Sequence, residues 1–155
     1  ILDHEDAIGI HYTGWQRGTY PTADTARSIF DTGTLYVGVD ETGAVWGSMN
    51  LNGQQLPEYQ NGAWTIPAED RQVAVIHTLT IDPARAGQGL ARQMAAFAED
   101  TARRQGKTVL RLDTGTENLP ANRMYPALGY KAAGTVDTFF MGDAQRPLNL
   151  YEKKL

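Results

Sequence analysis

Apolar residues in this chain recur first at helical and then at extended spacing, and the two patterns together predict an α/β protein. Ile8, Tyr12 and Trp15 follow an acidic cluster at steps of four and three, which predicts a helix that ends near Gly18. A second helix is expected over residues 21–33. Strands are expected at residues 35–39, 44–51, 73–81, 108–112, 130–136 and 148–152, with further helices at 90–106 and about 120–127.

The order of these elements predicts a single domain built on one mixed sheet with helices on its faces. The chain of 155 residues has the length of one domain, here residues 1–155, and is long enough to bury a core without a metal or a disulfide. The strand at 73–81 is nearly all apolar and β-branched, so we expect both of its faces to be covered. The polar segment 52–70 carries Tyr59 and Trp64, and aromatic residues in a long loop are typical of loops that cover a site.

Composition and charge narrow the function. The absence of cysteine excludes disulfides, thiolate nucleophiles and cysteine-ligated zinc. The balance of 14 basic and 18 acidic residues gives a net charge of −4, which argues against binding to nucleic acid or to an anionic membrane. No apolar run approaches the roughly 20 residues of a membrane helix, and no signal-peptide pattern is present. We therefore expect a soluble cytoplasmic domain. Because the chain starts at Ile1, whether a further strand precedes it stays open.

The chemically informative segment follows the strand at 73–81. Pro83 ends that strand, and Gly87 and Gly89 stand where the next helix begins. The first N–H groups of a helix have no intrahelical partner and carry a partial positive charge, so small residues there let a phosphate approach closely. The segment predicts an anion site, with a simple tight turn as the alternative. A dinucleotide fold fits less well, because the third glycine of its fingerprint is missing and the unit lies in the middle of the chain.

A second cluster lies on the short helix after the next strand, in the segment NLPANRMYPALGY of residues 118–130. Together the two clusters resemble the GNAT superfamily of N-acetyltransferases over residues 73–130. The first resembles the acetyl-CoA signature of that superfamily, with Gly89 and Ala91 at its small-residue positions. The second resembles its N-x-x-A-x-x-x-Y-x-x-L-G-F/Y segment, with matches at Asn118, Ala121, Tyr125, Leu128, Gly129 and Tyr130.

This resemblance implies a fold, a co-substrate and a set of binding residues. The expected fold is a central mixed, mostly antiparallel sheet with helices on both faces and splayed central strands. The expected reaction is direct transfer of an acetyl group from acetyl-CoA to an amine, without a metal. Main-chain groups of Leu79 and Ile81 would pair with the pantetheine arm. The other residues implied in acetyl-CoA binding are Arg85, Gly87, Gln88, Gly89, Leu90, Ala91, Asn118 and Tyr125.

Two residues are candidates for proton transfer. By resemblance, Tyr125 is the general acid, since a phenol with a pKa of about 10 is protonated at neutral pH and can donate to a leaving thiolate. The alternative for Tyr125 is a core aromatic residue. His77 is the candidate base, because imidazole titrates near neutrality. The alternative for His77 is a buried, hydrogen-bonded core histidine. Alternation along the strand places His77 on the same face as Val75, Leu79 and Ile81, and that face could be closed core. The three histidines have no metal-ligand spacing.

The sequence departs from the family pattern at two positions. Ala86 stands where the family usually has Gln or Arg, with Arg85 one residue early, so one side-chain contact to the cofactor departs from the family pattern. Pro126 follows Tyr125 inside the expected helix. Proline removes an N–H and disfavours helical geometry in the residue before it, so we expect a local distortion at Tyr125. Asn118 is expected to cap the same helix or to contact the cofactor.

The acceptor is less defined than the donor. Arg111 and Asp113 lie on the same side of their strand, where an ion pair or a turn-capping aspartate is expected. Net acidity and an aromatic-rich loop favour a small amine as acceptor. The alternatives are a protein N-terminus or lysine, and a non-catalytic acyl-CoA-binding or sensing domain; a monomer or a homodimer is expected. By resemblance, four aromatic residues border the acceptor groove, with core or lid packing as the alternative: Trp15, Tyr20, Tyr59 and Trp64.

Overall fold

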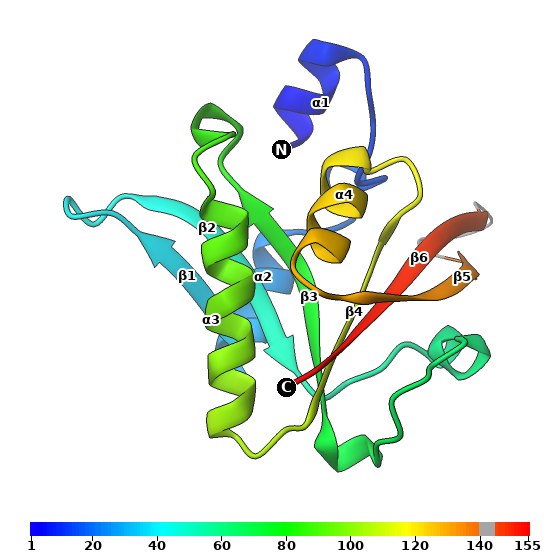
Figure 1. Cartoon of the computed structure of the whole chain (residues 1–155). Helices are drawn as coiled ribbons and strands as arrows, with labels where there is room; N and C mark the ends of the chain where they lie inside the picture. The colour runs from blue at the N-terminus through cyan, green and yellow to red at the C-terminus, as the bar shows by residue number, and fades with distance from the viewer. Residues whose placement is uncertain (140–144) are drawn as a thin grey trace.

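A computed structural model of the chain describes residues 1–139 and 145–155, and these residues form one six-stranded sheet (Figure 1). The strand order is β1-β2-β3-β4-β6-β5, and every neighbouring pair is antiparallel except β3 and β4. This confirms the predicted mixed, mostly antiparallel α/β fold. The elements are α1 (Leu2–Ile8), α2 (Ala23–Asp31), β1 (Leu35–Val39), β2 (Val45–Asn52), β3 (Val73–Ile81), α3 (Leu90–Arg104), β4 (Val109–Gly115), α4 (Leu119–Ala127), β5 (Lys131–Phe139) and β6 (Gln145–Lys154).

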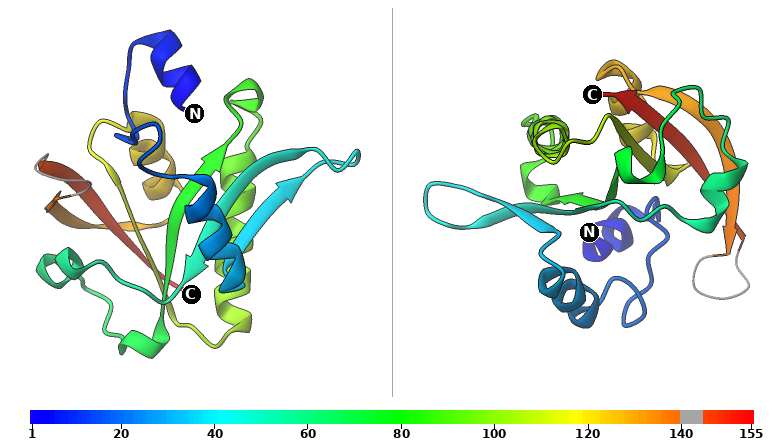
Figure 2. Two further views of the ribbon diagram at one scale, coloured as in Figure 1. Left: turned by 180° about the vertical axis from the view of Figure 1, so that it is seen from behind. Right: turned by 90° about the horizontal axis from the view of Figure 1, so that it is seen from below.

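Helices lie on both faces of the sheet (Figure 2), and the buried side chains form two cores, one under α3 and α4 and one under the segment between β2 and β3. α3 and α4 pack on one face, and α2 lies on the other. Because side chains alternate along a strand, neighbouring residues of β3 serve different cores. Ala74 and Ile76 pack under α3, whereas Val73 and Val75 pack under the segment between β2 and β3, beside Tyr59. The prediction that both faces of this strand are covered is therefore confirmed for its first half, Val73 to Ile76, whereas residues 77–81 are partly exposed.

The N-terminal helix is shorter than its apolar spacing predicts. α1 ends at Ile8 because Gly9 adopts a left-handed conformation (φ 67°), the usual way to close a helix. The buried carboxylate of Glu5 then accepts hydrogen bonds from the main chain and the hydroxyl of Thr13, and so turns the following segment back along the helix. Tyr12 and Trp15 consequently lie in a loop, and their regular spacing does not reflect a helix.

The expected distortion at Tyr125 is not present. α4 runs through Pro126 to Ala127, and the N–H of Leu128 still bonds the carbonyl oxygen of Met124. Proline lacks the N–H that would bond the carbonyl oxygen of Asn122 four residues earlier, so the helix loses that hydrogen bond, while the next turn still closes on Met124. The predicted cap is confirmed, since the side chain of Asn118 accepts a hydrogen bond from the N–H of Ala121.

Candidate active site

The two central strands run side by side only over their first halves. Parallel pairing of β3 with β4 extends from Val73–Val109 to Ile76–Leu112. Beyond that point β3 stays paired with β2 through Ile81, and β4 stays paired with β6 through Gly115. The sheet therefore splits into two wings, as the resemblance implies, and one edge of β3 is left open after Ile76.

A β-bulge in β3 lies beside the split. Ser48 of β2 pairs with Thr80, but Asn50 pairs with His77, so two residues of β3 face one of β2. Thr78 in the bulge has a φ of 47°, and it is the only non-glycine residue with positive φ in the described part of the chain. A β-branched residue in this conformation is strained, and such strain is typical of functional sites.

The bulge also changes which side chains share a face. Ile81 lies near Met94 of α3, and Leu79 packs on the same core as Ile76. His77 instead contacts the segment after β2 on the opposite face. The expectation that His77, Leu79 and Ile81 share one face is therefore wrong, because the extra residue at Thr78 reverses the alternation.

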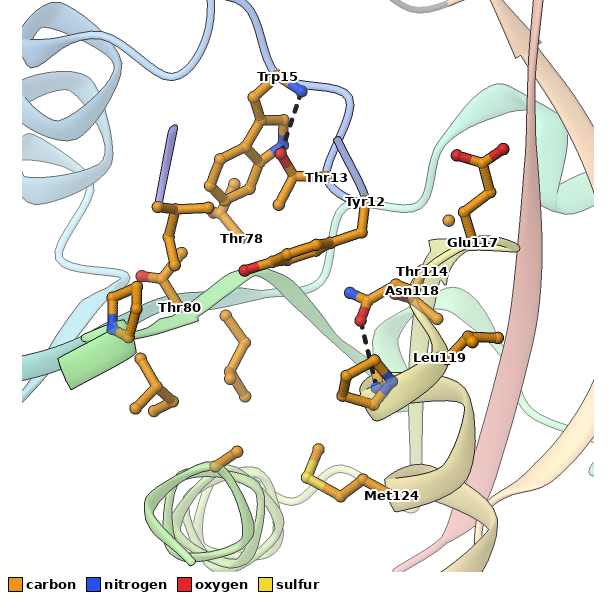
Figure 3. Close-up of a pocket in the computed structure, with 18 of the residues that line it drawn as sticks. Tyr12, Thr13, Trp15, Thr78, Thr80, Thr114, Glu117, Asn118, Leu119 and Met124 are labelled. Atoms are coloured by element: carbon orange, nitrogen blue, oxygen red, sulfur yellow. Dashed lines mark hydrogen bonds between the residues drawn. The ribbon is translucent and has the colours of Figure 1, made fainter. Parts of the chain in front are cut away.

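The split opens into a cleft of about 900 Å³ that is walled by both wings of the sheet. Its walls come from the end of β3 and the turn after it, the end of β4, the start of α4, and the N-terminal segment (Figure 3). In the close-up, the Tyr12 side chain extends from the N-terminal segment toward β3, while Asn118 lies on the other wall. The cleft thus meets α3 and α4 on one side of the sheet and the α1–α2 segment on the other.

The glycine turn forms one end of the cleft. Gly87 and Gly89 both have left-handed φ angles, of 78° and 77°, and a Cβ built on either would meet no atom within 4 Å. The N–H groups of residues 87–92 donate no hydrogen bond within the described protein, and α3 has no side-chain cap. Several uncapped amides beside open space form an arrangement that suits a phosphate group.

Arg85 precedes this turn and is held from outside the cleft. Its guanidinium forms an ion pair with Asp40 of the β1–β2 hairpin. Hydrogen bonds from Thr42 and Arg85 hold the pKa of Asp40 well below its usual range, so this carboxylate stays charged. Arg85 lines the cleft, but its charge is already partnered by Asp40, so neither Ala86 nor Arg85 offers an unpaired cation at this end of the cleft.

Tyr125 faces the cleft from α4 while its ring is buried. The ring packs against Tyr130 and Tyr151, with centroids 5.4 and 5.8 Å away. Its hydroxyl has no hydrogen-bond partner among the described residues. Burial and the nearby charge of Asp113 raise the pKa of Tyr125 above its usual value. The phenol is therefore protonated at neutral pH and free to donate.

Asn122 anchors the start of α4, and the sequence analysis did not single it out. Its side-chain amide donates to the carbonyl oxygens of Gly115 and Thr116, and its oxygen accepts from Asn149 and Tyr151. These bonds connect α4 to the end of β4 and to β6. Asn122 thereby fixes the wall of the cleft that carries Tyr125.

His77 is oriented by main-chain contact. Its Nε2 lies 3.0 Å from the carbonyl oxygen of Gln54 and 3.2 Å from Oδ1 of Asn52. A carbonyl oxygen only accepts, so Nε2 carries the hydrogen and the neutral ring keeps its lone pair on Nδ1. Burial lowers the pKa of His77, while Asp113 acts in the opposite direction. His77 lines the cleft and is neutral at pH 7, as a base must be.

Asp113 lines the same cleft and is not paired with Arg111, contrary to expectation. Its Oδ2 accepts a hydrogen bond of 2.7 Å from the hydroxyl of Tyr59. Arg111 instead donates to Gln55 and lies under the ring of Trp64, 4.1 Å from its centroid. Burial raises the pKa of Asp113, and the bond from Tyr59 partly offsets that effect.

Only two of the four expected acceptor-site aromatics line the cleft. Trp15 and Tyr20 do, and their rings contact each other edge to face. Tyr59 and Trp64 do not, because Tyr59 is buried under the sheet and Trp64 stacks on Arg111. The positions of Tyr59 and Trp64 on the loop therefore reflect packing.

All of the expected acetyl-CoA residues except Gln88 line the cleft. Gln88 lies between the two glycines. The residues that line the cleft are Leu79, Ile81, Arg85, Gly87, Gly89, Leu90, Ala91, Asn118 and Tyr125.

The N-terminal segment is held against the cleft by β6. Arg146 donates to the carbonyl oxygen of His11, and its guanidinium fills the space that a Cβ on Gly14 would occupy.

Within residues 1–139 and 145–155, no cluster of three or more acidic, histidine or cysteine side chains is placed to hold a metal ion. None of the described helices combines the length and apolarity that crossing a membrane requires.

Several solved structures described as acetyltransferases share this architecture. A putative acetyltransferase from Salmonella typhimurium, solved with its cofactor acetyl-CoA, has a TM-score of 0.69 at 18% identity, covering 99% of this chain and 84% of that one. A GNAT-family acetyltransferase from Listeria monocytogenes has a TM-score of 0.69 at 21% identity, covering 99% and 83%. A putative phosphinothricin N-acetyltransferase has a TM-score of 0.66 at 20% identity, covering 88% and 84%. These likenesses show the fold, which is that of the GNAT acetyltransferases.

Sequence comparison identifies the family. The family model described as acetyltransferase (GNAT) family matches residues 4–130. An uncharacterized N-acetyltransferase from Methanocaldococcus jannaschii is 32% identical over 68 residues, which are 44% of this chain and 30% of that protein's length. The chain belongs to the acetyltransferase (GNAT) family.

Proposed function

We propose that this protein transfers the acetyl group of acetyl-CoA directly to the amine of a small molecule. The observation that carries the proposal is the pairing of uncapped amides at residues 87–92 with a protonated phenol at Tyr125, in one cleft beside the open edge of β3. An acyltransferase of this kind needs an anchor for the donor, an acid for the thiolate and a base for the amine. The chain offers a candidate for each.

The donor would bind on the side of α3 and α4. The amides of Gly87, Gln88, Gly89, Leu90 and Ala91 would hold the pyrophosphate, because a charge-assisted bond to a phosphate replaces the bonds that these N–H groups lack. Main-chain groups of Leu79 and Ile81 would pair with the pantetheine arm, since the edge of β3 that faces the cleft is unpaired there. Asn118 would add a polar contact beside its role as helix cap.

Two residues would move protons during the transfer. Nδ1 of His77 would take a proton from the ammonium group of the acceptor, directly or through a water molecule, so that the amine nitrogen can attack the thioester carbon. When the bond from carbon to sulfur breaks, the Tyr125 hydroxyl would donate to the leaving thiolate. The nitrogen still carries an extra proton after the attack, and the Tyr125 phenolate would take it as the amide forms, directly or through a water molecule. The proton on His77 would pass to solvent, so the products are an N-acetyl amine, free CoA and one proton, and no acyl-enzyme forms. A main-chain N–H on the open edge of β3 would stabilise the oxyanion.

The acceptor would enter on the side of α1 and α2. Trp15 and Tyr20 line the cleft there, and their paired rings would pack on the apolar part of a small amine. The N-terminal segment covers this side, which favours a small molecule over a protein chain.

A thiol-release assay tests the proposal. Purified protein with acetyl-CoA is offered a panel of small amines, amino acids and short peptides, and free CoA is measured with a thiol reagent. We expect amine-dependent release, with the N-acetyl product confirmed by mass spectrometry. Release only with peptides would indicate a peptide acetyltransferase. Tight binding of acetyl-CoA in calorimetry without release for any acceptor would indicate a non-catalytic acyl-CoA-binding domain and would contradict the proposal.

A further inference from the structure

One of the two residues that flank the point where β3 and β4 separate is a carboxylic acid without a lysine or arginine partner among the described residues. The last joined pair of the two strands is Ile76–Leu112, and both of these side chains pack under the helices of the donor side. The next residue on each strand is therefore His77 and Asp113. Since successive side chains of a strand point to opposite faces, both lie on the acceptor side of the sheet, one on each wing.

Asp113 is only partly satisfied by the protein. Its Oδ2 accepts from Tyr59, but Oδ1 has no hydrogen-bond partner among the described residues, and no ion pair joins this carboxylate to a lysine or arginine there. The nearest basic group on the facing strand is His77, whose pKa is lowered by burial and which is therefore neutral. Asp113 lies at the wall of the cleft and is partly buried, so a carboxylate there without a counter-ion is costly, and a bound cation would offset that cost.

We infer that Asp113 binds the ammonium group of the acceptor and makes the enzyme selective for cationic amines. This inference rests on the proposed function. The ammonium would lie between Oδ1 of Asp113 and Nδ1 of His77, where one group attracts the cation and the other accepts its proton. Asp113 is thus a binding and specificity residue, and the hydrogen bond from Tyr59 fixes the orientation of its carboxylate.

The same geometry should make the cationic substrate bind more tightly than the neutral N-acetyl product. The acceptor arrives with a positive charge that Asp113 attracts, and acetylation converts it to a neutral amide that lacks both the charge and the ammonium donors. Because charge-assisted hydrogen bonds are roughly twice as strong as neutral ones, Asp113 favours substrate over product. The N-acetyl product should therefore inhibit weakly.

The test compares primary amines with alcohols of the same shape. Benzylamine and benzyl alcohol are one such pair, and n-butylamine and n-butanol are another. Each is titrated by calorimetry into protein saturated with CoA, so that no turnover occurs. We expect the amines to bind the wild-type protein about 10–100-fold more tightly than the alcohols. In Asp113→Asn, which replaces the free oxygen or the accepting one by an NH₂ donor, this preference should disappear.

Two further variants separate binding from structure. Tyr59→Phe removes the hydrogen bond that orients Asp113 but keeps the carboxylate, so it should lower thermal stability and reduce the preference for amines clearly less than Asp113→Asn does. Asp137→Asn makes the same change of charge at an exposed position of β5, outside the cleft, and should alter nothing. Loss of the preference in Tyr59→Phe to the same extent as in Asp113→Asn would assign Asp113 a purely structural role and overturn the inference.

Kinetics keeps this inference distinct from the proposed function. If the wild-type protein acetylates amines, Asp113→Asn should raise the KM for the amine about 10–100-fold and leave the KM for acetyl-CoA unchanged. Acetylation with an unchanged amine KM in Asp113→Asn would overturn the inference and leave the proposed function standing. Preferential binding of amines that depends on Asp113, without any transfer, would overturn the proposed function alone. Equal binding of amine and alcohol to the wild-type protein, including no binding of either, overturns the inference.

Discussion

Ile76 and Leu112 form the last residue pair that joins the two central strands, and the site begins one residue further on each strand. Up to this pair, the sheet is continuous and its side chains fill two cores. After it, β3 follows β2 and β4 follows β6, so the main chain of β3 is exposed to a cleft. The position of this pair therefore decides which residues can face a substrate.

At Gly89, a negatively charged side chain should weaken acetyl-CoA binding more than a neutral side chain of the same size. Gly89→Asp and Gly89→Asn place side chains of equal size in the open space before α3, and both residue types adopt left-handed φ angles more readily than others. The aspartate would bring a carboxylate to the pyrophosphate site. We expect Gly89→Asp to bind acetyl-CoA at least about tenfold more weakly than Gly89→Asn, because like charges there repel. Calorimetry measures both, and equal affinities would contradict the assignment of the amides.

Removal of the Tyr125 hydroxyl should affect chemistry more than binding. Tyr125→Phe keeps the ring that packs on Tyr130 and Tyr151, so the fold should be retained. We expect kcat to fall about 10²-fold while the dissociation constant of acetyl-CoA stays within about threefold. Tyr151→Phe is the matched control, since it loses a hydrogen bond to Asn122 outside the reacting centre. It should lower Tm and spare kcat; equal losses of kcat in both variants would remove Tyr125 from the acid role.

The turnover number kcat should fall at acidic pH, and the midpoint of this fall should be the pKa of His77. A base acts in its deprotonated form, so activity is lost as the pH drops through its pKa. Because burial lowers the pKa of His77, this limb of the kcat profile should lie below about 6.5, the ordinary value for histidine. His77→Gln should lower kcat and abolish the limb. An unchanged profile in this variant would exclude His77 as the base.

His77 should also make stability depend on pH. The folded protein disfavours the protonated ring, whereas the unfolded chain binds a proton at its ordinary pKa. The free energy of unfolding should therefore decrease as the pH falls below about 6.5 and level off below the folded pKa. Urea titrations of the wild-type protein and His77→Gln between pH 5 and 8 measure the difference, which should shrink to zero if His77 is not buried in its neutral form.

Replacement of Thr78 in the bulge by glycine should not destabilise the protein. Thr78 holds a left-handed conformation that costs an L-residue about 1–2 kcal/mol, and glycine adopts it freely. Thr78→Gly should therefore leave the free energy of unfolding unchanged or raise it by about 1 kcal/mol, after loss of the side chain's contacts. Thr80→Gly lies beyond the bulge, where Thr80 bonds Ser48, and should lose about 1 kcal/mol. Chemical denaturation of both variants provides the comparison, and a marked loss in Thr78→Gly would show that the bulge is not strained.

The sequence predicted correctly those elements whose conformation depends on neighbouring residues along the chain. The structure forms the strand expected at 73–81 and the glycine-containing turn expected after it. The side chain of Asn118 caps α4, as expected. The sequence was a poor guide where a single residue interrupted a regular pattern. Gly9 ended α1 although the apolar spacing continued to Trp15, and Thr78 reversed the alternation that placed Leu79 and Ile81 beside His77.

Pattern and motif along the chain thus predicted the fold class and the elements that carry the glycine turn, His77 and Tyr125, because these depend on neighbours a few residues apart. The roles of these residues in anion binding and proton transfer stay predictions. Contacts between distant segments decided the rest. Asp113 meets Tyr59 across 54 positions of sequence and has no counter-ion from Arg111, and its place opposite His77 depends on the register of two strands that separate. Register and strand separation arise from packing against helices and neighbouring strands, and no local spacing encodes them.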